Sequence, residues 1–153
     1  MKKSTFLVFI IVYLFFSISG FLFPFDSDWY RTLAKPDWTP DGSVIGIIWA
    51  ILFGFIALST AIVYQERGFG RHNSEYMSLL GINYILNQVF SYLQFNLHAL
   101  FATFMDALFI TITTLLLIFL AGRQNRFAGW LLLPYFLWTA FATYLSWLFY
   151  SLN

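Results

Sequence analysis

The side chains that usually carry enzyme chemistry are scarce in this chain. The 153 residues include no cysteine, which excludes thiolate catalysis, disulfides and cysteine-ligated metals. The two histidines, His72 and His98, lie apart without the spacing of a metal site. We therefore expect no bound metal ion and no resident cofactor, and aromatic rings and amides remain as the candidate functional groups.

Aromatic rings beside small residues form the first pattern. Trp49 precedes Phe53 by one helical turn in an apolar run. A second run carries rings followed by small groups, in the order Tyr135, Trp138, Ala142 and Ser146. A ring next to small residues suits a pocket for a flat apolar ligand, whereas tryptophans near helix ends commonly form an interfacial belt. We assign Trp138 to a pocket, and Trp147 and Tyr150 to the belt.

Amides form the second pattern. Asn83, Asn87, Phe90 and Gln94 follow one another at helical spacing and share one face. Amides in hydrocarbon need partners, so this stripe must face the interior of a helix bundle. It either joins helices by hydrogen bonds or lines a cavity, and the two roles are compatible.

Asp106 is the only formal charge well inside an apolar run. A carboxylate near mid-bilayer costs about 2.5–3.5 kcal/mol on insertion scales, so it must be paired, protonated or exposed to a wet cavity. We favour a structural hydrogen-bonding role over a functional one. No second charge lies within a run, so a proton relay or ion pump lacks its chain of groups.

Composition shows which elements must position these residues. Hydrophobic residues make up 60% of the chain and charged residues only 10%, against about 25% charged in soluble domains. A net charge of +1 gives no indication of nucleic-acid binding. The apolar runs are continuous rather than alternating, so they predict helices and not a barrel. The chain is therefore predicted to be an all-α integral membrane protein.

We expect a single transmembrane domain over residues 1–153. Each run is long enough to cross about 30 Å of hydrocarbon. The five predicted spans are residues 6–25, 44–64, 76–97, 99–120 and 128–150. Pro134 is expected to kink or restart the last helix. The first run could instead be a cleaved signal peptide, since Ser17-Ile18-Ser19 precedes Gly20, but it continues through Phe21 as a retained helix would.

Residues 26–42 form a loop that is unusually rich in rings. It contains two tryptophans, a tyrosine and two prolines, namely Trp29, Tyr30, Pro36, Trp38 and Pro40. Prolines lower the entropy cost of ordering a loop, and large rings need something to cover. We predict that this loop is a folded lid over a pocket.

The charges predict the orientation. Six lysines and arginines fall on the side of the N-terminus: Lys2, Lys3, Arg67, Arg71, Arg123 and Arg126. Only Arg31 and Lys35 fall on the other side. We expect a cytoplasmic N-terminus, with the lid and the C-terminus outside.

Small residues on the second span predict a close helix contact. Gly46, Ala50 and Gly54 recur at every fourth position, and such a seam lets another helix approach closely. The neighbour is either a helix of this chain or a helix of a second subunit.

Two motifs resemble the translocator protein (tryptophan-rich sensory protein) family, in particular its bacterial members. The first is W-Y-x4-K-P-x-W-x-P over residues 29–40, followed by Trp49. The second is P-Y-x2-W-x-A-F-A-T-x-L over residues 134–145. Asn87 and Asp106 also match family positions, and the resemblance covers essentially the whole chain.

The resemblance implies a five-helix bundle, usually dimeric, in the plasma membrane. It implies binding of porphyrins such as protoporphyrin IX, often of cholesterol, and of isoquinoline or benzodiazepine-type ligands. Carried over residue by residue, the ligand site comprises Tyr30, Pro40, Trp49, Phe53, Asn83, Asn87, Phe90, Trp138, Ala142 and Ser146. Arg31 or Lys35 is expected to reach a propionate. We do not expect cholesterol, because the sterol pattern needs a basic residue near the C-terminus and none follows Arg126.

Three functions remain after this comparison. The first is binding and sensing or translocation of tetrapyrroles in a cavity between helices. The second is light- and oxygen-dependent degradation of protoporphyrin IX, with Trp49 and Trp138 as the oxidisable side chains. The third, a channel or small-solute transporter, is disfavoured by the lack of a chain of intramembrane charges and of a detectable inverted repeat.

Overall fold

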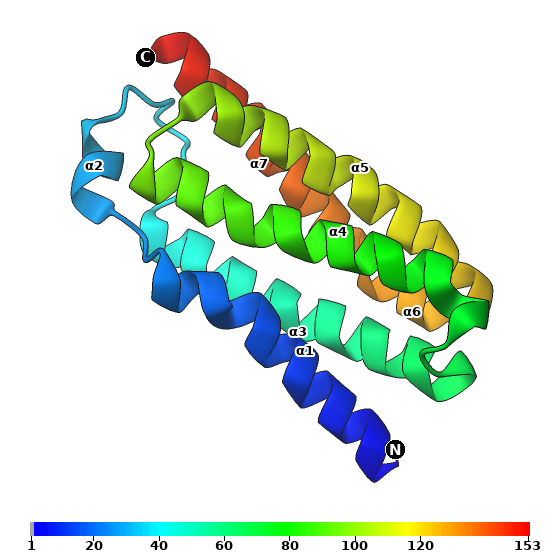
Figure 1. Cartoon of the computed structure of the whole chain (residues 1–153). Helices are drawn as coiled ribbons and strands as arrows, with labels where there is room; N and C mark the ends of the chain where they lie inside the picture. Colours follow the sequence, from blue (N-terminus) through cyan, green and yellow to red (C-terminus); the bar gives the residue numbers. More distant parts are fainter. Residues whose placement is uncertain (1) are drawn as a thin grey trace.

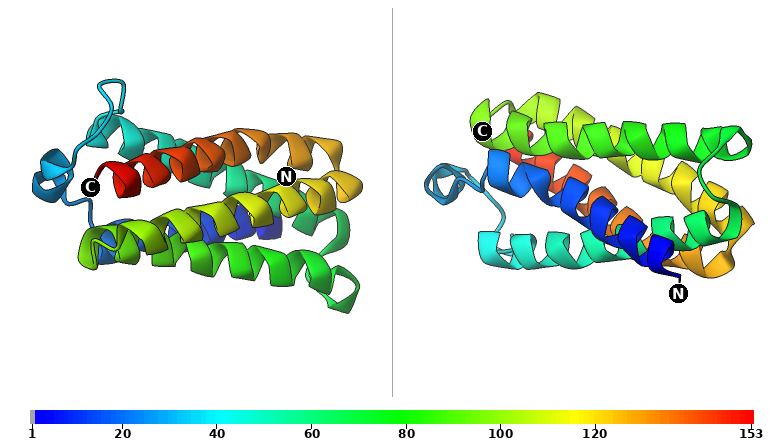
Figure 2. Two further views of the ribbon diagram at one scale, coloured as in Figure 1. Left: turned by 90° about the horizontal axis from the view of Figure 1, so that it is seen from above. Right: turned by 60° about the horizontal axis from the view of Figure 1, so that its bottom comes forward.

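The computed structural model describes residues 2–153, and this part of the chain is helical without strands. The elements are α1 (Lys3–Leu22), α2 (Ser27–Thr32), α3 (Gly42–Arg67), η1 (Arg71–Asn73), α4 (Ser74–Ser91), the π-helical turn η2 (Tyr92–Asn96), α5 (Leu100–Gln124), α6 (Arg126–Leu131) and α7 (Leu133–Leu152). The long helices run side by side, and the two termini lie at opposite ends of the bundle (Figure 1). Helix α2 lies at the end that also holds the C-terminus, as the views in Figure 2 show.

Local sequence explains where several helices begin and end. The Asp26 side chain accepts a hydrogen bond from the Trp29 amide and caps α2. Asn125 likewise accepts from the amides of the first turn of α6. Gly68 ends α3 in a positive-φ conformation (φ 68°) that favours glycine. Pro134 lies in the first turn of α7, where its missing N–H costs little, so the expected restart of the last helix is observed.

Within the described residues, four helical segments are long and apolar enough to cross a membrane. They are Lys3–Leu22, Gly42–Arg67, Leu100–Gln124 and the combined Arg126–Leu152. The predicted span over residues 76–97 falls on α4 and η2, which do not belong to this set. The all-helical, membrane-spanning architecture is therefore confirmed, but the count of five spans is not.

The core fills the half of the bundle that is remote from the lid. Fully buried residues from several helices meet there, including Val63, Tyr76, Leu117 and Leu132. A second, smaller cluster lies at the lid, where Tyr30 and Leu33 pack against Leu145 and Phe149 of α7. Residues 26–42 are thus docked on the bundle by a core of their own.

The small-residue seam of α3 faces another helix of the same chain. The Tyr13 hydroxyl of α1 donates to the Ala50 carbonyl at 3.3 Å, and Tyr13 also approaches Gly54. Gly46, one turn closer to the lid, has no neighbouring atom at the position of a Cβ. The seam therefore belongs to the contact between α1 and α3 over only part of its length.

Candidate ligand-binding site

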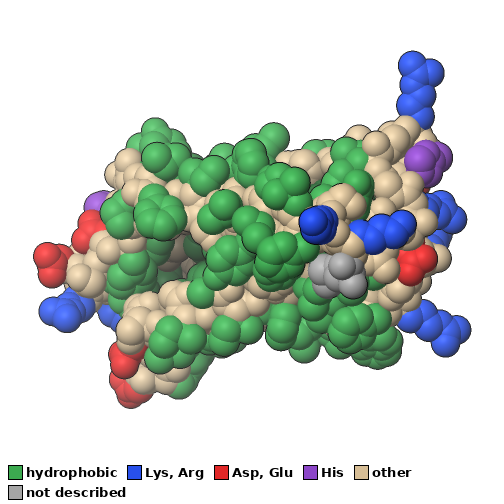
Figure 3. Space-filling model, turned by 90° about the horizontal axis from the view of Figure 1, so that it is seen from below, with side chains coloured by type: hydrophobic (Ala, Val, Ile, Leu, Met, Phe, Trp, Pro, Cys, Tyr) green, Lys and Arg blue, Asp and Glu red, His purple; other side chains and the backbone are tan. Residues whose placement is uncertain are grey.

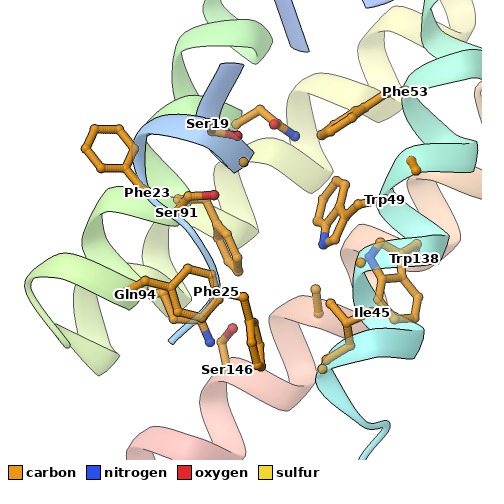
Figure 4. Close-up of a pocket in the computed structure, with 18 of the residues that line it drawn as sticks. Ser19, Phe23, Phe25, Ile45, Trp49, Phe53, Ser91, Gln94, Trp138 and Ser146 are labelled. Atoms are coloured by element: carbon orange, nitrogen blue, oxygen red, sulfur yellow. The ribbon is translucent and has the colours of Figure 1, made fainter. Parts of the chain in front are cut away.

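A cavity of about 290 Å³ lies between α1, α3, α4 and α7, beneath the lid. This volume is just below the range of about 300–1,000 Å³ that is usual for small-molecule sites. Its surface is largely apolar, with a few polar side chains (Figure 4). This composition suits an apolar ligand that is oriented by a small number of hydrogen bonds.

Two indoles form one wall of this cavity. The ring centroids of Trp49 and Trp138 lie 6.4 Å apart, with an interplanar angle of 86°. Phe53 and Phe90 lie within 5.6 Å and 6.4 Å of Trp49, and Phe141 lies 5.4 Å from Trp138. The two indoles meet edge to face, the other rings are tilted against them, and contacts of this kind stabilise the wall.

The indole nitrogen of Trp138 has no partner among the described residues. Nε1 is buried and makes no hydrogen bond, although an indole N–H usually finds an acceptor when it is buried. Trp138 itself lines the cavity, so this unpaired donor belongs to a residue of the cavity wall.

Polar side chains of α4 and α7 form the opposite wall. Asn87 is 4% exposed and donates to the Tyr135 hydroxyl at 3.2 Å. Gln94 lies in the π-helical turn and Ser146 on α7, and both face the cavity together with Ser91 (Figure 4). Single π-helical turns occur frequently at functional sites.

Asn83, one turn further down α4, has a different role. It is fully buried, donates to the hydroxyls of Thr113 and Thr114 at 2.9 and 3.0 Å, and accepts from the Tyr135 hydroxyl at 2.9 Å. It does not line the cavity. The amide stripe therefore joins helices at Asn83 and borders the cavity at Asn87 and Gln94.

The lid closes the cavity through Tyr30. This ring is 6% exposed, and its hydroxyl donates to the Pro40 carbonyl at 2.9 Å. Burial raises the pKa of Tyr30 to about 12, and the nearby Asp41 carboxylate adds to the increase. The hydroxyl therefore remains a protonated donor at neutral pH. Pro40 contributes through its carbonyl to the lid and does not line the cavity.

Lys35 belongs to the structure of the lid. Its Nζ donates to the carbonyls of Tyr30 and Leu33 at 2.7 and 3.4 Å and lies 4.7 Å from the centroid of the Tyr30 ring. Its donors are therefore engaged at the end of α2. Of the two cations expected to reach a carboxylate, Arg31 is the exposed one.

Two contacts fasten the lid to the bundle. His98, in the turn between η2 and α5, stacks on Trp29 at 4.2 Å with an interplanar angle of 6°, and its Nε2 lies 3.5 Å from Asp26. At the other side, the Asn153 side chain accepts from the Ala34 amide at 3.0 Å and donates to the Ala34 carbonyl at 3.1 Å. The lid is thus held near its start and at its middle.

The structure brings most of the predicted site residues together around one cavity. Those that line it are Tyr30, Trp49, Phe53, Asn87, Phe90, Trp138, Ala142 and Ser146. Pro40 and Asn83 were predicted with them but lie outside the lining. Trp147, assigned to the belt, is 43% exposed and also lies outside.

One whole wall of the cavity was missed. Helix α1 contributes Tyr13, Ser17 and Gly20, and the residue that follows the helix, Phe23, continues the same helical spacing. The signal was a stripe of small and polar residues within an apolar run. Phe25 and Ile45, from either side of the lid, were also missed and lie at the lid end of the cavity (Figure 4).

Asp106 lies on α5 outside the cavity lining and is 5% exposed. Its carboxylate oxygen Oδ2 has no hydrogen-bond partner within residues 2–153. The structural hydrogen bond expected from the sequence is therefore not observed at that oxygen. Within the same residues, no group of His, Asp and Glu side chains is arranged to hold a metal ion.

Comparison with known proteins gives the family. The chain is 53% identical over 153 residues to the tryptophan-rich protein TspO of Bacillus cereus, covering all of this chain and 99% of the relative. It is 53% identical over 146 residues to the uncharacterized membrane protein YtaB of Bacillus subtilis, covering 95% and 94% of the two chains. A TspO protein of Chlorobaculum tepidum is 31% identical over 134 residues, covering 85% and 83%.

The resemblance of the lid and of the last helix to one family is thus supported over nearly the full length. The TspO/MBR family model matches residues 6–151, which include every wall of the cavity and the lid. The chain belongs to the TspO/MBR family of membrane proteins.

Proposed function

We propose that the protein binds tetrapyrroles such as protoporphyrin IX, and other flat apolar ligands of the isoquinoline type, as a membrane sensor or translocator. The observation that carries this proposal is the pair of perpendicular indoles in the cavity wall, one with an unpaired N–H. Flat rings stack on Trp49 or Trp138, and a ring nitrogen or carbonyl accepts from Trp138 Nε1. Propionates would turn toward Gln94, Ser91 and Ser146 at the lid end of the cavity.

The proposal includes a single domain with five spans. We add helix α4 to the four long apolar segments as a further span, because its polar residues face the bundle interior and its outer face is apolar. Asn83 and Asn87 are buried, whereas Ile82 and Ile85 are 51% and 60% exposed. Its low average hydropathy then reflects satisfied amides inside the bundle and not contact with water.

The proposal also includes an orientation and an assembly. With five spans, the arginines of the α3–α4 and α5–α6 connections lie on the side of the N-terminus, which the charge rule assigns to the cytoplasm of a plasma-membrane protein. The lid and cavity then face outward. A homodimer is expected from the family resemblance.

A titration in lipid nanodiscs tests ligand binding. We expect saturable, one-to-one binding of protoporphyrin IX, seen as a shift of its absorption band, and competition by a flat isoquinoline. Partition of porphyrin into empty nanodiscs supplies the baseline. A signal that matches this baseline at every concentration would refute the binding function.

The two indoles also support a second candidate function, oxidation of the bound porphyrin. The excited porphyrin would pass its energy or an electron to dioxygen, which is the oxidant, and indole is the most readily oxidised side chain at the cavity. The protein would hold the ring and limit access of water. Mass spectrometry after illumination, with dark and oxygen-free controls, tests this reaction. Products identical to those of free porphyrin under the same light would exclude an enzymatic role.

A further inference from the structure

We propose that ligands enter and leave the cavity sideways, from the outer half of the bilayer, through a window between α1 and α3. The inference rests on the proposed function, because it takes the cavity to be a ligand site. It specifies the class of ligand as molecules dissolved in the membrane. The window is defined by two closed edges and an open centre.

The lower edge is the contact between Tyr13 and α3. The Tyr13 hydroxyl donates to the Ala50 carbonyl at 3.3 Å. A Cβ on Gly54 would lie 3.9 Å from the Tyr13 ring, which is ordinary van der Waals contact. On the side of Tyr13 that is remote from the lid, the two helices are in contact, and the hydrophobic core continues there.

The upper edge is the ring of Phe25, in the chain that leads from α1 to the lid. This ring packs so closely on Gly42 that a Cβ there would overlap it. Phe25 also lies 5.0 Å from the ring centroids of Tyr30 and of Phe95. The aromatic contacts close the space between the lid and the outer ends of α1 and α3.

Between these two edges, each of the two helices has a glycine beside the opening. Gly20 of α1 and Gly46 of α3 both line the cavity, and both are exposed on the surface. A Cβ at either position would meet no atom within 4 Å. A residue that belongs both to the lining and to the surface marks a place where the cavity is open, and the face in Figure 3 is hollowed toward its left side.

The surroundings of the window are suited to lipid. Ile47 and Ile51 of α3 are 62% and 53% exposed, and Phe21 of α1 is 84% exposed. Figure 3 shows that hydrophobic side chains dominate this face between the charged ends. In a bilayer, the molecules that reach the window are therefore acyl chains and dissolved apolar compounds.

The route from water is closed by more interactions. It passes the lid, where the buried Tyr30 donates to Pro40. The contacts of Trp29 with His98 and of Ala34 with Asn153 also fasten the lid to the bundle. Opening the lid would break all of these together. A ligand that passes between Gly20 and Gly46 breaks none of them.

The experiment uses a thiol in the cavity, because the chain has no cysteine of its own. Ser146→Cys places one near-isosteric thiol in the lining, next to the lid. Its labelling in nanodiscs is followed with a membrane-dissolved pyrene maleimide and with a charged, water-soluble thiosulfonate. We expect the membrane-dissolved reagent to label the thiol and the charged reagent to label it much more slowly.

Filling the window should then block the labelling. Adding Gly46→Leu to Ser146→Cys is expected to slow the pyrene reagent about tenfold or more, which corresponds to about 1.4 kcal/mol of added barrier. Gly81→Leu is the matched control: Gly81 is also a helical glycine with no atom within 4 Å of a Cβ, but it lies on α4 outside the lining. It should leave the rate unchanged. If Gly46→Leu does not fold, Gly20→Leu closes the same window from α1.

Two results would overturn the window. One is that the pyrene reagent labels the Ser146→Cys thiol at the same rate with Gly46→Leu, with Gly20→Leu and with the control Gly81→Leu. The other is labelling by the charged reagent as fast as by the pyrene reagent and unaffected by either leucine. Labelling does not depend on porphyrin, so a protein that passes this test but fails to bind porphyrin would refute the proposed function and leave the window standing.

Discussion

Truncation of Trp138 gives the most direct test of the cavity wall. Trp138→Ala removes an aromatic side chain of a type that covers about 150–250 Å². The ring shares its surface among Trp49, Phe141 and the cavity, so about a third, ~50–80 Å², is left to a ligand. At about 25 cal/mol per Å² this area contributes about 1.3–2 kcal/mol. The dissociation constant of protoporphyrin IX should therefore rise about ten- to thirtyfold.

Trp147→Ala is the matched control. Trp147 lies on the same helix, is 43% exposed, and packs on Phe104 and Tyr150 at 5.3 and 5.7 Å, outside the cavity. Its removal should change the dissociation constant by less than about twofold. Binding should be followed by porphyrin absorption, since either substitution alters the tryptophan fluorescence itself. Equal losses for the two variants would refute the assignment of Trp138 to the site.

Three further outcomes are expected. Trp49→Phe and Trp138→Phe keep an aromatic face, so porphyrin should still bind, while light-dependent conversion measured by mass spectrometry should fall if the oxidation proposal holds; conversion at the wild-type rate would contradict it. Tyr135→Phe removes the hydroxyl that donates to Asn83 and should lower the free energy of unfolding by about 1–3 kcal/mol, measured by thermal unfolding in detergent. The pKa of Tyr30 is raised to about 12, so its protonated form stabilises the lid fully below about pH 10, and this contribution is lost as the pH rises toward 12. Tyr30→Phe should abolish that pH-dependent step, as seen in proteolysis of the lid.

Several of the predicted residues that line the cavity are costly to place in lipid. Asn87 and Trp138 have groups that need a partner or a particular depth, so helical spacing alone identified the face on which they lie. Asn83 satisfies the same pattern, but spacing cannot show where along a seam a cavity ends. That limit depends on whether threonine hydroxyls of α5 fill the space, as Thr113 and Thr114 do.

The residues that were missed cost nothing in lipid. Gly20 and Ser17 on α1 are small enough for any face of a membrane helix, so no local penalty distinguished the wall of a cavity from a lipid-facing surface. Lys35 was expected at a ligand because it is a cation near a site, but the carbonyls at the end of α2 already engage it.

The end of the bundle opposite the lid is closed by direct contact between backbones. A Cβ on Gly129 of α6 would lie 2.9 Å from the Cα of Gly122 on α5, and the Ser59 hydroxyl of α3 donates to the Ala128 carbonyl at 2.7 Å. Glycine at both positions leaves no flexible side chain that could swing aside. The bundle is therefore tightly closed at this end, and the proposed ligand exchange would take place only in the half that holds the lid and the cavity. Carriage of a ligand to the opposite leaflet, the translocator role in the proposed function, would require these backbones to separate.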